Sequence, residues 1–510
     1  MKHIRWKAGI ATIALLFAFP SMTVDAYTDY TKELTYVYSS KGVSMNIPTS
    51  YEYKRAISLK SLEESLGVSI TSLADMFVKE NGELYVVEKE LGAILCFDEK
   101  QEFSGMKQEF YEADGSVITL NKPEGVFVSD DHIFYIADTG NNRIIVAKED
   151  GSIIRIIERP ENILGTDLVS FIPTSLVVDS VGRISVVARN INSGIMQFSK
   201  DGVFTGYTGA PSVSIDAFTK LLRKISTAKQ KAQMQTYVPT EYNNIKIDAK
   251  NFIWGTISSI SATDLLEVIN GKDLSGAITP IKKLNTMGVD VLNRKGVYAP
   301  VGDLIFTDDP SKIVDVGIGP NNIYSLLDNT KGRIFTYNND GILLYAFGNK
   351  GTKKGNMQTP AAIDYIGKDI YVLDSGLCQI LIYEPTYYGN LLIDAEGYYD
   401  LGDYNAANAM WKEVAELNSN FSYAYIGLGN ALYSNGEYEE AMEYYEYAND
   451  AENYSKAKEK LRKETSEGIF PIVFCSVFGV MILSVSVAAS KRIRRYVKGE
   501  ELHLGKGEEE

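Results

Sequence analysis

Histidine and cysteine are among the scarcest residues of this 510-residue chain, with three of each. His3 and His503 lie close to the two ends, which leaves His132 as the only histidine in the long middle part. A zinc site built from several histidines is therefore excluded. A Ser-His-Asp or Cys-His nucleophile system is excluded as well, unless His132 serves it alone. His132 follows two aspartates in what reads as a plain hairpin turn.

With so few cysteines, an exported chain depends on its core and not on covalent cross-links. Cys96 and Cys378 fall in the first and last of the repeats described below, at different repeat positions, so a disulfide between them is not favoured. Positive charge is also in deficit, since 66 acidic residues face 51 basic ones and the net charge is −15. This balance argues against nucleic acid or anionic lipid as a partner.

The two ends carry targeting signals. Lys2, Arg5 and Lys7 precede the apolar run 8–19, and small residues end at Ala26, which is typical of a secretory signal peptide over residues 1–26. An uncleaved anchor is the alternative, although the run is shorter than the roughly 20 residues that span a bilayer.

Residues 469–489 are apolar and uncharged, and the basic cluster 491–495 follows at once. This pattern predicts one transmembrane helix, a cytoplasmic tail over 490–510 and an N-terminal ectodomain outside the cell membrane.

Short β-type runs repeat through the first three quarters of the chain. Four of them, Val126–Ser129, Ile133–Ala137, Arg143–Lys148 and Ser152–Ile157, fit into fewer than about forty residues without a helix, which predicts one antiparallel sheet. The run that forms the second strand recurs six times, at intervals of about 50 to 70 residues. Its copies begin near Leu84, Ile133, Ile184, Ile253, Ile323 and Ile370. Such repeats predict a six-bladed, all-β propeller over residues 27–386.

The second copy resembles the NHL repeat family. Its Pro123-Glu124-Gly125 entry, the segment from Asp138 to Arg143 and the Asp150-Gly151 hairpin carry the resemblance. We interpret Asp138 and Asn141 as satisfying turn amides, and Arg143 as packing between blades.

The sixth copy lacks a fourth strand, and an extended segment at 44–59 is expected to fill that place and close the ring. Residues 27–42 look irregular. Residues 212–235, with an apolar stripe that includes Phe218, Leu221 and Leu222, predict a helical insertion.

From Tyr387 the composition changes and a 34-residue period links Gly402 to Gly436. Residues 387–467 resemble the tetratricopeptide repeat, an all-α fold, with Trp411 and Tyr445 expected between helices. The resemblance implies a concave groove that binds an extended peptide or a sugar chain. The residues expected to face this groove are Glu396, Tyr399, Asn430 and Tyr433.

The repeat register places one residue of each entry near the channel mouth of the propeller. These residues are Asp75, Glu124, Thr174, Asn243, Asp315 and Ala361. Such a polar, acid-leaning ring suits a cation or a polyhydroxylated ligand. It also resembles gluconolactonase-like propellers, which implies a calcium-dependent hydrolase as the alternative function.

The expected function is a membrane-anchored scaffold or ligand-binding protein in an envelope or transporter-associated complex. Its partner is expected to be a protein or a glycan at the cell surface, not a nucleic acid. The protein is expected not to be an enzyme and to need no cofactor, with calcium as the ion that the channel could take.

Overall fold

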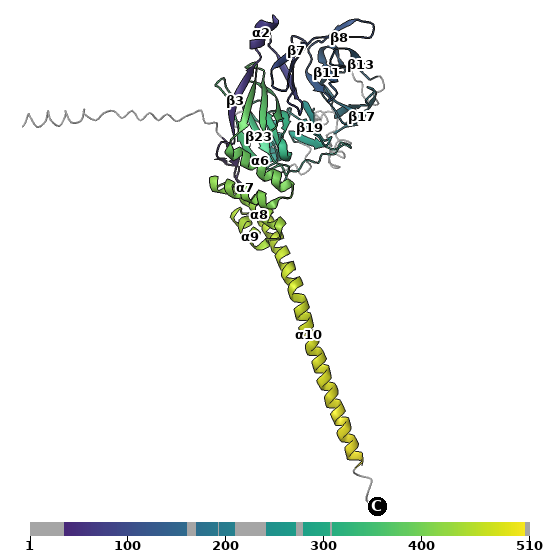
Figure 1. The fold of residues 1–510 in the computed structure, drawn as a ribbon, viewed down its shortest axis with the longest axis vertical. Helices are drawn as coiled ribbons and strands as arrows, with labels where there is room; N and C mark the ends of the chain where they lie inside the picture. The colour runs from purple at the N-terminus through teal and green to yellow at the C-terminus, as the bar shows by residue number, and fades with distance from the viewer. Residues whose placement is uncertain are drawn as a thin grey trace, which may run out of the picture.

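The computed structural model describes residues 35–160, 170–191, 193–209, 241–271, 279–305 and 309–504, with side chains as far as residue 498. The expected signal peptide (1–26) and helical insertion (212–235) lie outside the described residues. Figure 1 shows a rounded β domain, a small stack of helices against it, and one long helix that projects away from both.

The β domain is a ring of six antiparallel blades. Their strands, from the channel outward, are β4 (Leu73–Val78), β5 (Leu84–Glu88), β6 (Ala93–Phe97) and β7 (Phe103–Lys107) in blade 1; β10 (Gly125–Val128), β11 (Phe134–Asp138), β12 (Arg143–Ala147) and β13 (Ile153–Ile157) in blade 2; β14 (Pro173–Val178), β15 (Ile184–Ala188), β16 (Ile195–Phe198) and β17 (Phe204–Thr208) in blade 3; β18 (Asn244–Ile247), β19 (Ile253–Thr256) and β20 (Ile281–Leu284) in blade 4; β21 (Ile313–Ile318), β22 (Tyr324–Asp328), β23 (Arg333–Tyr337) and β24 (Leu343–Phe347) in blade 5; and β25 (Pro360–Ile366), β26 (Asp369–Asp374) and β27 (Gln379–Pro385) in blade 6. A hairpin of β8 (Glu109–Tyr111) and β9 (Val117–Thr119) joins blades 1 and 2, and the short helices α2 (Ser61–Leu66) and α5 (Ala262–Ile269) lie in connections.

The second strands explain why the repeat is visible in the sequence. Strands β5, β15 and β22 are buried along their whole length, because neighbouring blades cover both faces of each sheet. Strands covered on both faces read as continuous apolar runs. The predicted fold class, an all-β six-bladed propeller followed by an all-α region, is confirmed.

The ring closes between its first and last parts. Strand β3 (Tyr51–Ser58) pairs antiparallel with β27, so the N-terminal segment supplies the fourth strand of blade 6. Tyr51 is fully buried there, stacks on Phe347 with ring centroids 5.3 Å apart, and donates a hydrogen bond to the Lys368 carbonyl oxygen at 2.8 Å. Closure leaves no long unpaired edge on this blade.

The predictions for the N-terminal segment need two corrections. The strand expected over 44–59 is interrupted, and only β3 belongs to blade 6. The segment expected to be irregular contains β1 (Tyr36–Tyr38), which pairs with β24 and with β2 (Ser44–Asn46) on the outer side of blade 5. Pro48, which has no N–H to give to a ladder, lies at the break.

Four blades end their second strand with a fully buried carboxylate: Glu88, Asp138, Asp328 and Asp374. Each accepts hydrogen bonds from backbone N–H groups just before its own first strand, as Glu88 does from Thr71 and Ser72 at 2.9 and 2.8 Å. Asp138 also accepts from Arg143 Nε at 2.8 Å. These carboxylates hold the entries of the first strands in place, and those entries form one mouth of the channel.

The helices stack as antiparallel pairs. They are α6 (Tyr387–Asp400), α7 (Tyr404–Leu417), α8 (Ser422–Asn435), α9 (Tyr438–Tyr447) and α10 (Ala451–Leu504). Trp411 and Tyr445 are each 2% exposed. They fit because glycines face them: a Cβ at Gly427 would lie 2.5 Å from the Trp411 ring, and one at Gly429 would lie 2.6 Å from Tyr445.

The helical stack is joined to the propeller by a shared core. One cluster of buried side chains runs from Tyr51, Tyr345 and Tyr383 in blades 5 and 6 to Leu392 and Trp411 in the helices. The turn η2 (Pro320–Asn322) adds polar contacts, since Asn321 Nδ2 donates to the Ile393 carbonyl oxygen at 2.8 Å. Figure 1 shows α6 lying against the propeller and α7 to α9 following below it.

Within the described chain, α10 is the one helix long and apolar enough to cross a membrane, judged by length and composition. Its side chains from 469 to 489 are exposed almost throughout, so no other part of the protein covers them. The helix runs on to Leu504, through much of the segment expected to be a tail.

Candidate functional site: the central channel

The first strands of the six blades converge on a central channel, and two cavities open into it. The entry cavity, of about 360 Å³, lies where the first strands begin, and the exit cavity, of about 920 Å³, lies where they end. Asp75 on β4 reaches both. Both volumes lie in the range of small-molecule sites.

The entry cavity collects most of the residues that the repeat register placed at the channel mouth. Asp75, Glu124, Thr174, Asn243 and Ala361 line it together. They come from five different blades, so the shared register brings them to one height in the ring. Asp315, the sixth expected residue, does not line this cavity and is fully buried beside it.

Two basic residues that the register did not point to also line the entry cavity. Lys89 Nζ contacts Glu124 Oε1, and Arg189 Nη2 contacts Glu124 Oε2. Each basic residue directly follows a second strand, β5 or β15. A search of the positions after second strands would have found them. Glu124 is thus a carboxylate held between two cations at the wall of a polar hollow.

Asn243 brings an amide to the same hollow. Its Nδ2 donates to the Val314 carbonyl oxygen at 2.6 Å. Its Oδ1 is buried and has no hydrogen-bond partner among the described residues. The cavity therefore presents a fixed acceptor together with the hydroxyls of Ser72, Thr174 and Ser175.

Lys246 forms the waist between the two cavities. Its Nζ lies 2.8 Å from Asp364 Oδ2 and 3.7 Å from Asp315 Oδ2, and it donates to the Met76 carbonyl oxygen at 3.3 Å. Burial lowers the pKa of Lys246, but the carboxylates of Asp315, Asp364 and Asp75 outweigh burial and raise that pKa above its usual value. The side chain is therefore a fixed ammonium.

The carboxylates around Lys246 pay for their enclosure. Asp75 is reached from both cavities, yet protein surrounds its carboxylate, and burial raises its pKa to about 6 against the opposing effect of Lys246. Burial likewise raises the pKa of Asp315 to about 7. The waist thus holds three carboxylates and one ammonium, and two of the carboxyl groups titrate near neutral pH.

Asp315 has a structural role in this waist. Its Oδ1 accepts from Asn244 Nδ2 at 2.7 Å, and its Oδ2 accepts from the backbone N–H of Ile363 at 2.8 Å. Ser175 Oγ donates in turn to Asn244 Oδ1. These bonds link blades 3, 4, 5 and 6 around the channel. The expectation that Asp315 lies at the open mouth is therefore wrong.

The donor set does not fit the calcium ion of the alternative function. Among the described residues, no three His, Cys, Asp or Glu side chains are grouped so that they could hold a metal ion. The position central to Asp75, Asp315 and Asp364 is taken by the ammonium of Lys246. Calcium prefers six to eight oxygen ligands, and a fixed ammonium repels it.

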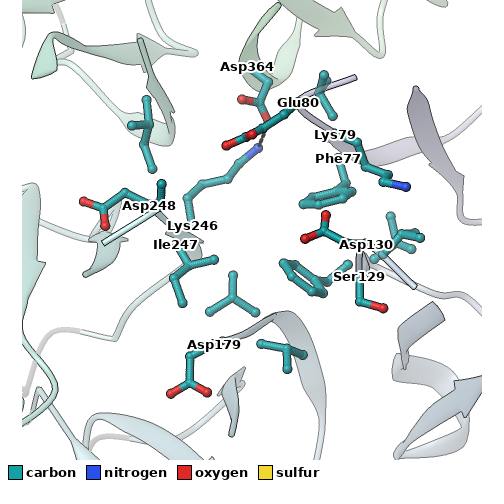
Figure 2. Close-up of a pocket in the computed structure, with 18 of the residues that line it drawn as sticks. Phe77, Lys79, Glu80, Ser129, Asp130, Asp179, Lys246, Ile247, Asp248 and Asp364 are labelled. Atoms are coloured by element: carbon teal, nitrogen blue, oxygen red, sulfur yellow. Dashed lines mark hydrogen bonds and ion pairs between the residues drawn. The ribbon is translucent and has the colours of Figure 1, made fainter. Parts of the chain in front are cut away.

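The exit cavity has a different lining (Figure 2). The rings of Phe77 and Phe127 lie 4.9 Å apart between centroids, and Tyr135 lies 6.1 Å from Phe127. Ile247 and other aliphatic side chains line the remaining wall. Figure 2 shows Lys246 extending to Asp364 at one end of this hollow.

The expected groove of the helical stack is wrong at Glu396. This residue is 8% exposed, and its Oε1 accepts from Asn338 Nδ2 at 3.2 Å and from Tyr423 Oη at 2.9 Å. Burial raises its pKa to about 7. The reason is that α6 packs on blade 5, so the side of α6 expected to line an open groove is covered.

The other three groove residues are half-buried and not freely exposed. Tyr399 packs on Tyr404 with centroids 5.5 Å apart, and Tyr433 packs on Tyr438 at 5.2 Å. Asn430 Oδ1 accepts from Tyr445 Oη at 2.8 Å. The structure brings Asn430 and Tyr433 together on α8, apart from the buried Glu396.

The remaining singled-out residues have structural settings. His132 adopts a positive φ of 54° in the hairpin before β11, and its Nδ1 lies 3.9 Å from Glu83 Oε2. Cys96 and Cys378 are both buried free thiols, without a disulfide between them.

Comparisons with known proteins show the fold. No family model and no curated protein sequence matches the chain. Among solved structures, virginiamycin B lyase from Staphylococcus aureus matches with 12% identity and a TM-score of 0.39, over 65% of this chain and 99% of that one. A streptogramin B lyase matches with 11% identity and a TM-score of 0.38, over 66% and 98%. A structural-genomics protein of unknown function from Bacteroides thetaiotaomicron matches with 10% identity and a TM-score of 0.39, over 70% and 77%.

These neighbours contradict the prediction that the protein is not an enzyme, because two of them are lyases of similar fold. At 11–12% identity and TM-scores below 0.4, the likeness is one of architecture and assigns no reaction to this chain.

Proposed function

We propose that the protein is a membrane-anchored, extracytoplasmic ligand-binding protein that combines an NHL-type propeller with tetratricopeptide-like helices. The proposal assigns the ligand to the entry cavity and takes a polyhydroxylated molecule, such as the end of a glycan, as its class. The helices and α10 then hold the propeller at a fixed position above the membrane, where it serves an envelope or transporter-associated complex.

The observation that carries the proposal is the donor and acceptor set of the entry cavity. Asn243 Oδ1 is an acceptor without a partner among the described residues, and the paired carboxylate of Glu124 is a second acceptor nearby. Lys89 and Arg189 are donors, and the hydroxyl of Thr174 is both. Sugar hydroxyls donate and accept in the same way, so each of these groups has a counterpart on a polyol.

The shared core between propeller and helices supports the display role. Side chains of blades 5 and 6 and of α6 to α8 form one cluster, so the two parts move together. The basic residues 491–495 that follow the apolar segment favour a cytoplasmic C-terminal end. The propeller is then outside the cell.

The test is a binding measurement on the full chain in lipid nanodiscs, with soluble oligosaccharides released from the producing cell's own surface as ligands. Glu124→Gln keeps the shape of the side chain and removes its charge. Charge-assisted hydrogen bonds are about twice as strong as neutral ones, so we expect affinity to fall by about tenfold.

Asn405→Ala, an exposed change on α7, is the matched control and should bind as the native chain does. If no oligosaccharide binds, or if Glu124→Gln and Asn405→Ala bind equally well, the entry cavity is not the ligand site.

A further inference from the structure

The exit cavity combines two features that the entry cavity lacks, an aromatic wall and an excess of carboxylates. Phe77, Phe127 and Tyr135 are half-buried rings that follow one another along blades 1 and 2. They leave part of their surface open to a hollow of about 920 Å³. Apolar surface that stays open in an enclosed hollow marks a place where a ligand's apolar body gains by burial.

The charged groups that line the exit cavity are mostly acidic. They are Asp75, Glu80, Asp130, Asp131, Asp179, Asp248 and Asp364, against Lys79 and Lys246. Both lysines are already paired, Lys79 with Glu83 at 2.9 Å and Lys246 with Asp364 at 2.8 Å.

The carboxylates of the exit cavity differ in how far they are engaged. Asp179 is paired with Arg183 at 2.7 Å, and Asp248 accepts from Trp254 Nε1 at 3.0 Å. Glu80 and Asp130 are exposed and make no side-chain hydrogen bond or ion pair with the described residues. Figure 2 shows the carboxylates of Glu80 and Asp130 directed into the hollow and those of Asp179 and Asp248 directed away from it.

We infer that the exit cavity binds an organic cation with an apolar, preferably aromatic, body. The body would lie against Phe77 and Phe127, where a nearby positive charge is also attracted by the ring faces. The charged end would lie between Glu80 and Asp130. An organic anion meets the wrong sign of charge, and a bare metal ion meets no set of three grouped ligands in the described chain. The inference concerns a different cavity and a different ligand class from the proposed function, so each stands without the other.

Tryptamine is the probe that matches this chemistry, and indole-3-propionate is its anionic counterpart with the same ring. Equilibrium dialysis with the full chain in nanodiscs measures both. We expect saturable tryptamine binding and none for indole-3-propionate. Equal binding of the two would overturn the inference, as would failure of tryptamine to bind.

Two variants locate the site. In the double variant Glu80→Gln, Asp130→Asn, the dissociation constant for tryptamine should rise about tenfold, because two carboxylates close to the ammonium are lost. Its matched control, Glu149→Gln with Asp201→Asn, changes the net charge equally at exposed positions outside the cavity and should leave binding unchanged. Phe77→Leu keeps the apolar volume and removes the ring, so affinity should fall about fivefold. If the double variant and its control bind alike, the cation is not held in the exit cavity.

Discussion

Glu396 offers the sharpest test of how the helical stack is held on the propeller. Its carboxylate lies at the contact between α6 and blade 5, 8% exposed, and it has hydrogen bonds from Asn338 and Tyr423 but no cation. Burial raises its pKa from 4.5 to about 7. The perturbation we consider is Glu396→Gln, which keeps the acceptor oxygen for both bonds and removes the ionisable proton.

The sign of the effect follows from where each state binds the proton. Below pH 4.5 the carboxyl is protonated in both the folded and the unfolded chain, and stability does not depend on it. Between pH 4.5 and about 7 the unfolded chain releases the proton first, so the native protein loses stability as pH rises. Above pH 7 both states are ionised and the loss is complete. A shift of about 2.5 pKa units corresponds to roughly 3 kcal/mol.

The assay is denaturant unfolding of the full chain in nanodiscs, native and variant, at pH values from 5 to 8. Glu396→Gln should match the native protein near pH 5 and exceed its stability by about 3 kcal/mol at pH 8. Asp75 and Asp315 also titrate near neutral pH, but they do so in both proteins and cancel in the difference. Glu443→Gln on the exposed side of α9 is the control and should follow the native curve. Parallel curves for Glu396→Gln and the native protein would refute the reasoning.

Three further changes test other parts of the structure. Trp411→Ala removes the large ring between α7 and α8 and should cost about 3–5 kcal/mol of folding free energy in denaturant titrations; a loss below 1 kcal/mol would contradict the packing. Deleting residues up to Ser58 removes β3 and exposes β27, so the purified chain should aggregate on light scattering, whereas a monomeric product would show that blade 6 does not need its fourth strand. A tag after Glu510 should resist protease added to intact spheroplasts, and its digestion would reverse the proposed orientation.

The sequence predicts the architecture well because the repeat encodes local physics. Apolar second strands, turn residues between them and a carboxylate at the strand end recur in successive copies, so each blade could be located alone. The same regularity carried the register to the first strands, which is why Asp75, Glu124, Thr174 and Asn243 meet at one cavity. A period shared by all copies places equivalent residues at equivalent heights in a ring.

The parts that the sequence did not predict depend on contacts between distant segments. Lys246 lies two residues beyond Asn244 on β18, and nothing in its own blade shows that Asp364 and Asp315 will surround it. Glu396 was assigned to an open groove by the helical register, and docking of α6 on blade 5 buries it. The hairpin of β1 and β2 was missed because its strands are only three residues each.

The position of Lys246 explains why one channel presents two unlike sites. A propeller channel lined by acids from several blades would be one continuous acidic hollow. Here the ammonium lies at mid-height, bonded to Asp364, to the Met76 carbonyl oxygen and, more distantly, to Asp315. It offsets part of the acidic charge where the blades meet, so the entry cavity is left with Glu124 between Lys89 and Arg189. The uncompensated carboxylates, Glu80 and Asp130, lie beyond the waist on the exit side. Because a buried ion pair is held strongly only while both partners stay, the waist is a fixed partition, and a ligand at one mouth is screened from the charges of the other.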